Sequence, residues 1–600
     1  MTKSSDLQLM YYQKEMSFLR QMGGVFAAKY PKIARRLSFT ENQSADPHVE
    51  RLLESFAFLS GYLQQDIDNQ FPRLSSALLS ILYPFLTNPI PPMSVAQFKP
   101  DTQKPMTTSY PIPKHFSVFT EAYDGEICRF RTCYPIDLWP LDVSDVAMVK
   151  TEKYDFGSSV TDHAYFMKIS LKAQGTPLNK LDIKKLRFYI NAHRTEANIL
   201  YQLLFEEDHQ IAVVGGGTTK ILGAGSIKQV GFSEDEAAIP TPANGHPAYG
   251  LLQEYFAFPK KYMFFDLEGL DFSHCKDSVE IFIPVSSPEE AKGVAFSKNT
   301  FLLGCAPIIN LFPRTTEPIR FDHKKIEYRL VPDYRREMTT EIYSLEKVFS
   351  SNLDAVEVQE IGPYFSYDHH SLQNKKTFFW FGRRTPSSNP RVPGTDYMLS
   401  FVNWECKPEL PSTEVVYART LCTNRHLATM VSGNTVLQED EGIPASSIIC
   451  LHPPTVPIYP DKEGATQWQL ISNLSLSYLS LSSETESLDA LKEILKLYSV
   501  NESRDVDIEI TRLLDMKCDQ TVRRLGKDAW RGFTKGMAVT LTLDEGDSYS
   551  LGTFLFSAVL SHFLGLYTHI NSFTELSIKK KHQEQIWKTW PAIAGTQPLL

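Results

Sequence analysis

The first segment whose residue types could bind a ligand is the glycine-rich run Val214–Lys220. A phosphate-binding loop follows the pattern G-x-x-x-x-G-K-[ST], because its backbone amides and its lysine must surround the phosphates together. Here no Gly-Lys-Ser/Thr follows the glycines at that spacing. We therefore interpret Gly215, Gly216 and Gly217 as a turn between two strands.

A second candidate is the metal-ligand cluster Asp368, His369 and His370. Adjacent residues of a strand point to opposite faces, so the two histidines cannot easily share one ion. No second group of His, Cys or Asp residues follows at ligand spacing, which favours a surface loop. The sequence also contains no G-x-S-x-G, H-E-x-x-H, Walker A or EF-hand pattern. We therefore predict that the protein has no catalytic residues, no metal and no cofactor.

Paired carboxylates are the third candidate, because a glycoside hydrolase uses two of them. Glu206-Glu207 and Asp235-Glu236 lie in polar stretches that are typical of solvated loops. The two carboxylates of such an enzyme can come from distant parts of the chain, so the sequence leaves this alternative open.

Two adjacent arginines, Arg383 and Arg384, follow the aromatic run Phe378–Phe381. Their guanidinium groups could clamp an anion or a carboxylate of a partner protein. The alternative is a strand end whose arginines form salt bridges within the chain. We name both arginines as candidate partner-interface residues.

The elements that position these residues belong to a large protein. The chain has 600 residues, and at about 150 residues per domain it must form several domains. Its net charge is -9, and it has no basic block longer than Lys579–Lys581. This disfavours nucleic-acid binding, which needs concentrated positive charge. Aromatic residues make up 12% of the chain, so much aromatic surface must be buried in domains or against other proteins.

The cysteines and the N-terminus bear on the cellular compartment. None of the eight cysteines forms a CxxC pair, and most stand alone in apolar stretches typical of buried free thiols. The first residues contain no apolar signal-peptide core. Together these features predict a cytoplasmic protein with reduced thiols.

The N-terminal region is predicted to be helical. Apolar residues recur there at spacings of three and four, and form one stripe: Leu9, Tyr12, Met16, Leu19, Met22, Phe26 and Tyr30. Tyr30-Pro31 is the expected boundary, because the residue before a proline disfavours the helical region. We predict that this stripe is a partner interface.

A second helix is predicted to begin at Asp46 as N-cap, with Pro47 at the first helical position. Its apolar face runs from Val49 to Ile67, and we expect it to end at Phe71-Pro72, before a short third helix over 74–82. A hairpin of two such broadly apolar helices leaves much apolar surface exposed to water. Each Å² of apolar surface left exposed costs roughly 25 cal/mol of free energy. We therefore expect the helices to join a larger bundle; the alternative is that they pack on this chain's own β domains.

Alternating apolar residues predict strands through most of the remaining chain, for example over 186–190, 279–283 and 539–543. The uncharged run Leu551–Tyr567 is too short for a membrane span and is interpreted as a buried core helix, so we predict no membrane insertion. The fold class is therefore α+β and multidomain. Its expected parts are an N-terminal helical-bundle segment over 1–95, a β-rich domain over 96–330, a second β-rich domain over 331–467 and a C-terminal α+β domain over 468–600.

Ordered phrases along the chain resemble the TssF family, also called ImpG or VasA, of type VI secretion system baseplate subunits. The resemblance begins with YYQKEMSFLRQMGGVFAAKYPKIARRL and the proline-rich end of the second helical region. It continues with FRTCYPIDLWPL (130–141), LLQEYFAFPKKYMFFDLEGL (251–270) and GCAPIINLFPRTTEPIRFDHKKIEYRLVPD (304–333). Later phrases are GTDYMLSF (394–401), RTLCTNRHL (419–427), WQLISNLSLSYLSL (468–481), YTHINSFTEL (567–576) and GTQPLL (595–600). The phrases cover essentially the whole chain, and none of them is a catalytic signature.

The resemblance implies a structural protein rather than an enzyme. Two TssF copies and one TssG are expected to form a wedge like that of phage baseplates, joined by TssK and TssE and assembled around the VgrG spike. The baseplate would dock at the inner-membrane complex, nucleate the sheath and inner tube, and trigger sheath contraction. The resemblance also implies that the N-terminal helices bundle with helices of TssG and of the second TssF copy, and that the C-terminal domain, which we expect to be independent, contacts that copy.

Two alternatives belong to other classes of protein. A β-rich polysaccharide hydrolase would need a pocket with two carboxylates about 5 to 10 Å apart. A carbohydrate-binding protein would be expected to be secreted and to expose aromatic platforms.

Overall fold

The structure is a computed structural model of the whole chain. It describes residues 2–36, 46–82, 84–101, 106–123, 125–151, 164–242, 245–321, 324–351, 358–364, 378–389, 392, 394–403, 415–460, 487–499, 504–524, 533–544, 552–568, 572–581 and 583–595. The chain forms two compact units. The helical unit comprises Met1–Leu82 and Asp461–Ser475, and the β-rich unit comprises Tyr83–Pro460 and Leu476–Leu600. The finer division predicted at 95, 330 and 467 stays a prediction.

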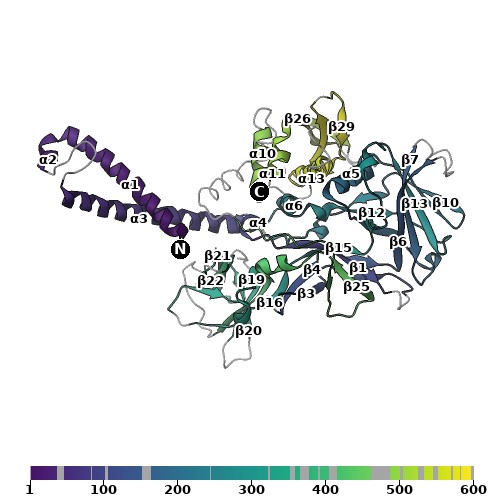
Figure 1. Cartoon of the computed structure of the whole chain (residues 1–600), viewed down its shortest axis with the longest axis horizontal. Coiled ribbons are helices and arrows are strands. Elements are labelled where there is room, and N and C mark those ends of the chain that lie inside the picture. The colour runs from purple at the N-terminus through teal and green to yellow at the C-terminus, as the bar shows by residue number, and fades with distance from the viewer. Residues whose placement is uncertain are drawn as a thin grey trace. The chain divides into compact units, whose positions relative to one another are not determined.

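The helical unit contains α1 (Thr2–Lys29), α2 (Pro31–Arg36) and α3 (Pro47–Leu82) (Figure 1). The predicted boundary at Tyr30-Pro31 is confirmed. The N-cap is confirmed too, since the backbone N–H of His48 donates to Asp46 Oδ1 at 2.9 Å.

The predicted helix end at Phe71-Pro72 is wrong, because α3 continues through Pro72 to Leu82. A proline inside a helix removes one backbone hydrogen bond and can kink the helix, but the turns on both sides can still propagate. The expected short third helix over 74–82 is therefore the last part of α3, and the next helix is α4 (Pro84–Thr87).

A six-stranded barrel begins the β-rich unit. Its strands, in spatial order, are β24 (Thr435–Leu437), β25 (Ala445–Cys450), β1 (Met93–Pro100), β15 (Cys305–Ile309), β4 (Glu126–Thr132) and β3 (Ser117–Tyr123). The sheet closes where Phe119 exchanges two backbone hydrogen bonds with Gln438, at 2.9 and 2.7 Å. Closure brings together strands from three distant parts of the chain and leaves neither end strand as a free edge at this point.

Two further sheets lie in the middle of the chain. The five-stranded sheet has the order β10 (Thr218–Leu222), β9 (Ile211–Gly215), β13 (Ser278–Val285), β7 (Tyr165–Ala173) and β6 (Leu141–Lys150). The four-stranded sheet has the order β11 (Ile227–Gln229), β12 (Phe264–Glu268), β8 (Lys185–Ile190) and β14 (Phe301–Leu302). A small ladder pairs β2 (Tyr110–Ile112) with β5 (Ile136–Leu138). The helices of this region are α5 (Arg194–Phe205) and α6 (Pro247–Ala257).

The glycine-rich run forms the predicted turn. Gly215 pairs with Thr218, and the two glycines between them have φ values of 60° and 79°. Positive φ at both central positions is what a tight hairpin turn requires. A phosphate loop is therefore excluded at this site.

An eight-stranded sheet follows. Its order is β16 (Phe312–Thr315), β23 (Val415–Thr423), β19 (Glu341–Ser351), β20 (Val358–Pro363), β21 (Phe378–Pro386), β22 (Thr395–Asn403) and β18 (Glu327–Leu330), with β17 (Ile319–Arg320) also on β23. The sheet curls around one apolar core that includes Val348, Leu399 and Val416. Its two ends approach each other, because Glu317 N donates to Val331 O at 2.9 Å.

A pair of asparagines joins the barrel to the eight-stranded sheet. Asn310 follows β15, and Asn424 follows β23. Asn424 N donates to Asn310 Oδ1 at 2.6 Å, and Asn310 Nδ2 donates to Asn424 Oδ1 at 2.9 Å. Arg129 of β4 donates its backbone N–H to the same Asn424 oxygen at 3.0 Å. Two of the phrases that resemble TssF therefore meet at this joint.

The C-terminal block contains a parallel crossover. Its elements are α10 (Ser487–Tyr498), α11 (Arg504–Thr511), β26 (Leu513–Arg524), β27 (Phe533–Leu543), α13 (Thr553–Leu566), β28 (Phe573–Lys580), β29 (Ile586–Thr589) and β30 (Ile593–Ala594). Strands β27 and β28 pair in parallel with α13 between them, and β26 pairs antiparallel with β27. Helix α13 is buried along almost its whole length, which confirms the predicted core helix. None of the described helices is long and apolar enough to cross a membrane.

The C-terminal block packs against elements from the middle of the chain. Helix α13 packs on α5 and α6 as well as on β28. Phe556 stacks on Tyr255 with ring centroids 5.7 Å apart, and Phe554 meets Tyr201 at 6.2 Å. The C-terminal block therefore shares its core with the middle of the chain, within one compact unit.

Candidate partner interface

Helices α1 and α3 pack antiparallel. Their contact consists of a few buried residues at its centre and polar pairs at its sides. Met16 and Ala57 are buried, at 6% and 0% exposure. A Cβ atom on Gly61 would lie 3.1 Å from Tyr12 N, so the two helix backbones approach closely at this glycine. At the sides of the hairpin, Arg20 pairs with Glu50 at 2.7 Å. The contact is narrow, because Met16 is the one large side chain among its three buried residues and the other two are Ala57 and Gly61.

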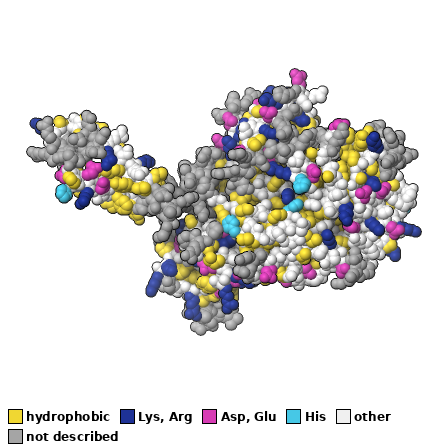
Figure 2. Space-filling view, in the orientation of Figure 1, with side chains coloured by type: hydrophobic (Ala, Val, Ile, Leu, Met, Phe, Trp, Pro, Cys, Tyr) yellow, Lys and Arg dark blue, Asp and Glu magenta, His cyan; other side chains and the backbone are white. Residues whose placement is uncertain are grey.

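Large apolar side chains stay exposed along both helices of this hairpin, and Figure 2 shows hydrophobic side chains gathered along it. Those on α1 are Leu9, Met10, Phe18, Met22, Val25 and Phe26, and those on α3 are Leu52, Phe56, Phe58, Leu59, Tyr62 and Leu63. Leu52 is 71% exposed and Leu63 is 61% exposed. A contiguous apolar surface of this kind marks an interaction site. We call these twelve side chains the apolar hairpin face.

The predicted stripe divides between the inside and the outside of the hairpin. Met16 is its buried member, and Tyr12 and Leu19 are half-buried. Its other members are exposed by 40% to 52%: Leu9, Met22, Phe26 and Tyr30. Their role toward a partner stays a prediction.

Sequence reasoning missed what holds the hairpin together. Ala57 and Gly61 are four residues apart on α3 and therefore share one face. This small-residue spacing is a signal that could have predicted the close approach of α1.

Arg383 and Arg384 have partners within the chain. Adjacent strand residues face opposite ways, so the two arginines lie on different sides of β21. Arg383 Nη2 pairs with Glu327 Oε2 at 2.7 Å. Arg384 lies on the core side, opposite Tyr397, with its guanidinium carbon 5.3 Å from the centre of that ring. The structure thus has the salt-bridged strand that sequence reasoning held as the alternative, and a role toward a partner stays a prediction.

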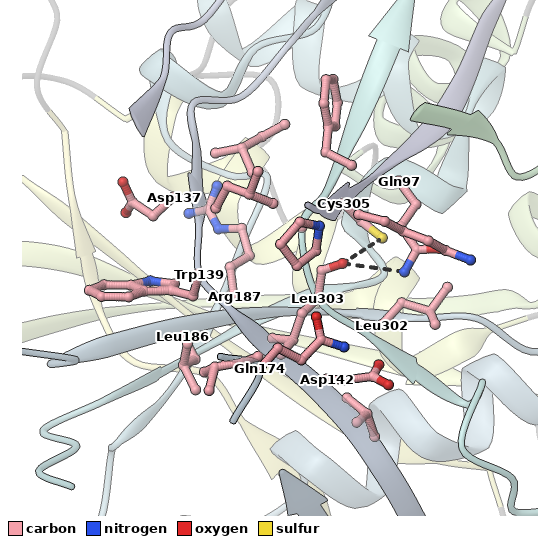
Figure 3. Close-up of a pocket in the computed structure, with 18 of the residues that line it drawn as sticks. Gln97, Asp137, Trp139, Asp142, Gln174, Leu186, Arg187, Leu302, Leu303 and Cys305 are labelled. Carbon is pink, nitrogen blue, oxygen red and sulfur yellow. Dashed lines mark hydrogen bonds between the residues drawn. The ribbon is translucent and has the colours of Figure 1, made fainter. Parts of the chain in front are cut away.

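The β-rich unit contains a cavity with a volume of about 420 Å³ (Figure 3). Four cationic side chains and two carboxylates line it: Lys99, Lys185, Arg187, Lys298, Asp137 and Asp142. Asp137 and Asp142 lie on opposite sides of the cavity in Figure 3. Two of these cations, Arg187 and Lys185, both bind Asp266, at 2.7 Å each. Arg187 also pairs with Glu236 at 2.8 Å, and Lys185 lies 3.6 Å from Glu268, so three carboxylates outside the cavity lining compensate the two charges.

One carboxylate of each pair is less solvated than the sequence suggested, whereas Glu207 and Asp235 are exposed. Glu236 accepts from Arg187 at 2.8 Å, and Glu206 accepts from Trp587 Nε1 at 3.2 Å. Both carboxylates therefore serve contacts between elements of the β-rich unit.

The other chemical candidates do not form a reactive centre in the described residues. Burial raises the pKa of the Cys128 and Cys133 thiols to about 12, so both stay protonated and are poor nucleophiles near neutral pH. No group of three or more His, Cys, Asp or Glu among the described residues could hold a metal ion. The candidate cluster 368–370 lies outside those residues.

Comparisons with known proteins agree on one family. The chain matches the family model described as "Type VI secretion system, TssF" over residues 4–597. The type VI secretion system component TssF1 of Pseudomonas aeruginosa is 28% identical over 617 residues, which cover 99% of this chain and 99% of that protein.

Two solved structures share the fold. A chain of the type VI secretion system TssK-TssF-TssG baseplate subcomplex matches with a TM-score of 0.73 and 24% identity, over 92% of this chain and 100% of that chain. A chain of the baseplate complex from the type VI secretion system matches with a TM-score of 0.61 and 21% identity, over 99% of this chain and 100% of that chain.

Proposed function

We propose that this chain, which belongs to the TssF family of type VI secretion system proteins, is a structural subunit of the baseplate wedge. The observation that carries the proposal is the apolar hairpin face, which the described part of the chain leaves uncovered. Apolar surface on this scale is stable in water only when another protein covers it. A protein with this surface is suited to assembly.

The proposed cover of the hairpin is a bundle with helices of TssG and of a second copy of this chain. Helices with apolar residues on several sides can be covered by more than one neighbouring helix. The solved TssK-TssF-TssG subcomplex contains a chain of the same fold, which supports TssG and TssK as partners.

The wider assembly extends the proposal. The wedge would also hold TssE and assemble around the VgrG spike, in a cytoplasmic baseplate that docks at the inner-membrane complex. From there it would nucleate the sheath and tube and trigger contraction. The C-terminal block would contact the second copy of this chain.

We propose a mechanical role without catalysis. The buried thiols are protonated, and in the cavity of Figure 3 Arg187 and Lys185 are already paired with Asp266, Glu236 and Glu268. Neither feature favours the hydrolase or carbohydrate-binding alternatives.

The test is co-purification of the full chain with TssG. The double variant Leu59→Asp with Leu63→Asp places two charges on side chains that are 60% and 61% exposed. We expect it to fold normally and to lose TssG, because a buried unpaired charge at an interface costs several kcal/mol.

The matched control is Val436→Asp with Val456→Asp on the β-rich unit, where the exposures are 60% and 61%. It should retain TssG. Equal TssG recovery with both double variants would overturn the proposed interface, and a chain that never recovers TssG would overturn the proposed function.

A further inference from the structure

The chain passes between its two units after Leu82, after Pro460 and after Ser475. At the first two of these points, the β-rich unit contains a described segment that leads to the junction: residues 84–92 and residues 453–460. We call these the connecting segments. They lie side by side, because Ile90 N donates to Ile458 O at 2.8 Å and Ile458 N donates to Ile90 O at 3.1 Å. Any load passed along the chain at these two junctions reaches the β-rich unit through this pair of segments.

Arg384 holds the first connecting segment. Its Nε donates to Asn88 Oδ1 at 3.1 Å, and its Nη1 donates to Ile342 O at 2.9 Å and to Thr395 Oγ1 at 3.0 Å. Its Nη2 donates to Tyr343 O. One guanidinium therefore ties residue 88 to strands β19 and β22 of the eight-stranded sheet.

Glu341 holds the second connecting segment. This carboxylate is almost fully buried and accepts from the Tyr459 hydroxyl at 3.0 Å. It also accepts from the backbone N–H of Thr395 at 2.9 Å and from the hydroxyl of the same residue. Arg425 Nη1 lies 3.6 Å from Glu341 Oε2 and supplies the compensating charge. Thr395 thus links the site of Glu341 to that of Arg384.

The backbone at Gly394 leaves room for the Arg425 and Glu341 side chains. Gly394 has a φ of 132°, and a Cβ atom there would lie 2.3 Å from Arg425 Nη1. Only glycine fits this position, because any side chain would displace the arginine from Glu341. Buried polar networks of this kind add little net stability over an apolar core, but their bonds are directional. An extended segment has no core of its own, so directional hydrogen bonds are needed to fix its position.

We propose that Glu341, Arg384 and Arg425 form a mechanical anchor for both connecting segments. They are positioning residues: they keep residues 84–92 and 453–460 paired on the eight-stranded sheet when a partner bound to the helical unit pulls on the chain. The proposal that the segments carry load rests on the proposed function in assembly. The anchoring itself does not, and can be measured on the free chain.

The test compares two neighbouring arginines. Arg384→Met breaks the anchor, and Arg383→Met is the matched control, because it removes a salt bridge from the other side of the same strand. Amide hydrogen exchange is measured by mass spectrometry on the full-length protein. Arg384→Met should raise exchange in peptides covering 86–92 and 453–460 about tenfold, as expected when hydrogen bonds to a charged group are lost. Arg383→Met should leave those peptides unchanged.

A second variant, Tyr459→Phe, removes one hydroxyl and keeps the ring, so the protein still folds. It should raise exchange in 453–460 more than in 86–92. If Arg384→Met accelerates exchange equally across β23 and the second half of β19, the arginine is a general core residue and the anchor is refuted. Unchanged exchange in both connecting segments refutes it as well.

Whether the connecting segments carry load is tested by assembly. Arg384→Met should still co-purify with TssG, since the hairpin is unaltered, but the complex containing TssK should be recovered at least about fivefold less than with Lys347→Met, which removes an exposed salt bridge to Glu360 from the same sheet. Equal recovery shows that the anchor bears no load in assembly. Failure of the unaltered chain to bind TssG contradicts the proposed function and leaves the exchange result to decide the anchor.

Discussion

The hairpin of α1 and α3 and the helix α13 are both rich in large apolar residues, but only α13 is covered within the chain. Phe556 and Phe563 of α13 are buried against aromatic residues of α6. On the hairpin, Phe56 and Leu59 of α3 remain 58% and 60% exposed. The difference lies in the neighbours, because α13 reaches two helices and a sheet while α1 and α3 offer each other a narrow contact. Apolar composition therefore identifies surfaces that must be buried. The fold decides which of them are buried within the chain and which are left for a partner protein.

The sharpest test of this comparison places the same substitution in both regions. Leu560→Asp on α13 buries a charge at a fully buried position and should destabilise the β-rich unit by about 4 kcal/mol or more. Leu63→Asp on α3 should change the free energy of unfolding by less than about 1 kcal/mol, because that side chain is already exposed. Urea unfolding followed by near-ultraviolet circular dichroism measures both. Similar losses in the two variants would remove the distinction between the regions.

A second test widens the narrow contact of the hairpin. Gly61→Leu forces a side chain against the α1 backbone, where a Cβ alone would lie 3.1 Å from Tyr12 N. Overpacking of this kind costs typically 1–3 kcal/mol, so the hairpin should melt at a lower temperature. Far-ultraviolet circular dichroism reports the loss of helix. Gly61→Ala is the milder control, and a higher melting temperature for Gly61→Leu would show that the helices do not meet at this glycine.

The third and smallest effect distinguishes the two regions by pH. Burial lowers the pKa of His452 and of His562, each to about 4, and both lie in the β-rich unit. Their unfolded pKa is near 6.5, so the unfolded chain binds more protons between these values. Stability is fully present above about pH 6.5 and is lost as the pH falls toward 4. At about pH 5.5 the loss should be about 1 kcal/mol for each histidine.

The measurement is the urea midpoint of the β-rich unit at about pH 7.5 and pH 5.5. His562 stacks on Phe232 with ring centroids 4.2 Å apart, so His562→Phe keeps an aromatic ring in place and removes one titrating group. Its pH dependence should be smaller than that of the unaltered chain. An unchanged pH dependence in this variant would contradict the assignment to His562.

Local features of the fold could be predicted from sequence. The cap at Asp46, the boundary at Tyr30 and the glycine turn at 216–217 each depend on residues within a few positions, so their chemistry is visible in the sequence. Pro72 shows where local reasoning fails. A proline disfavours the helix interior, but the sequence does not reveal whether the flanking turns are strong enough to continue.

The apolar composition of the candidate interface was predictable from the sequence, but which of its residues are buried was predictable only in part. The spacing of Leu9 to Tyr30 predicted an apolar stripe, but not that Met16 would turn inward while Phe26 stayed 40% exposed. Which side faces inward depends on where Gly61 lets the second helix approach. That position is a property of the pair of helices rather than of either one.

By itself, the sequence determined the helix starts, the alternating strands, the absence of recognisable catalytic motifs and the family to which the chain belongs. Those properties reside in residue type and short spacing, or in phrases preserved in order. The tertiary structure alone decided the hydrogen-bond partners of Arg384, which binds Asn88, nearly three hundred positions earlier in the chain. It also decided that α13 packs on α5 and α6, which lie about three hundred positions earlier in the chain. Long-range pairing of this kind depends on the whole set of packed surfaces, and no local pattern specifies it.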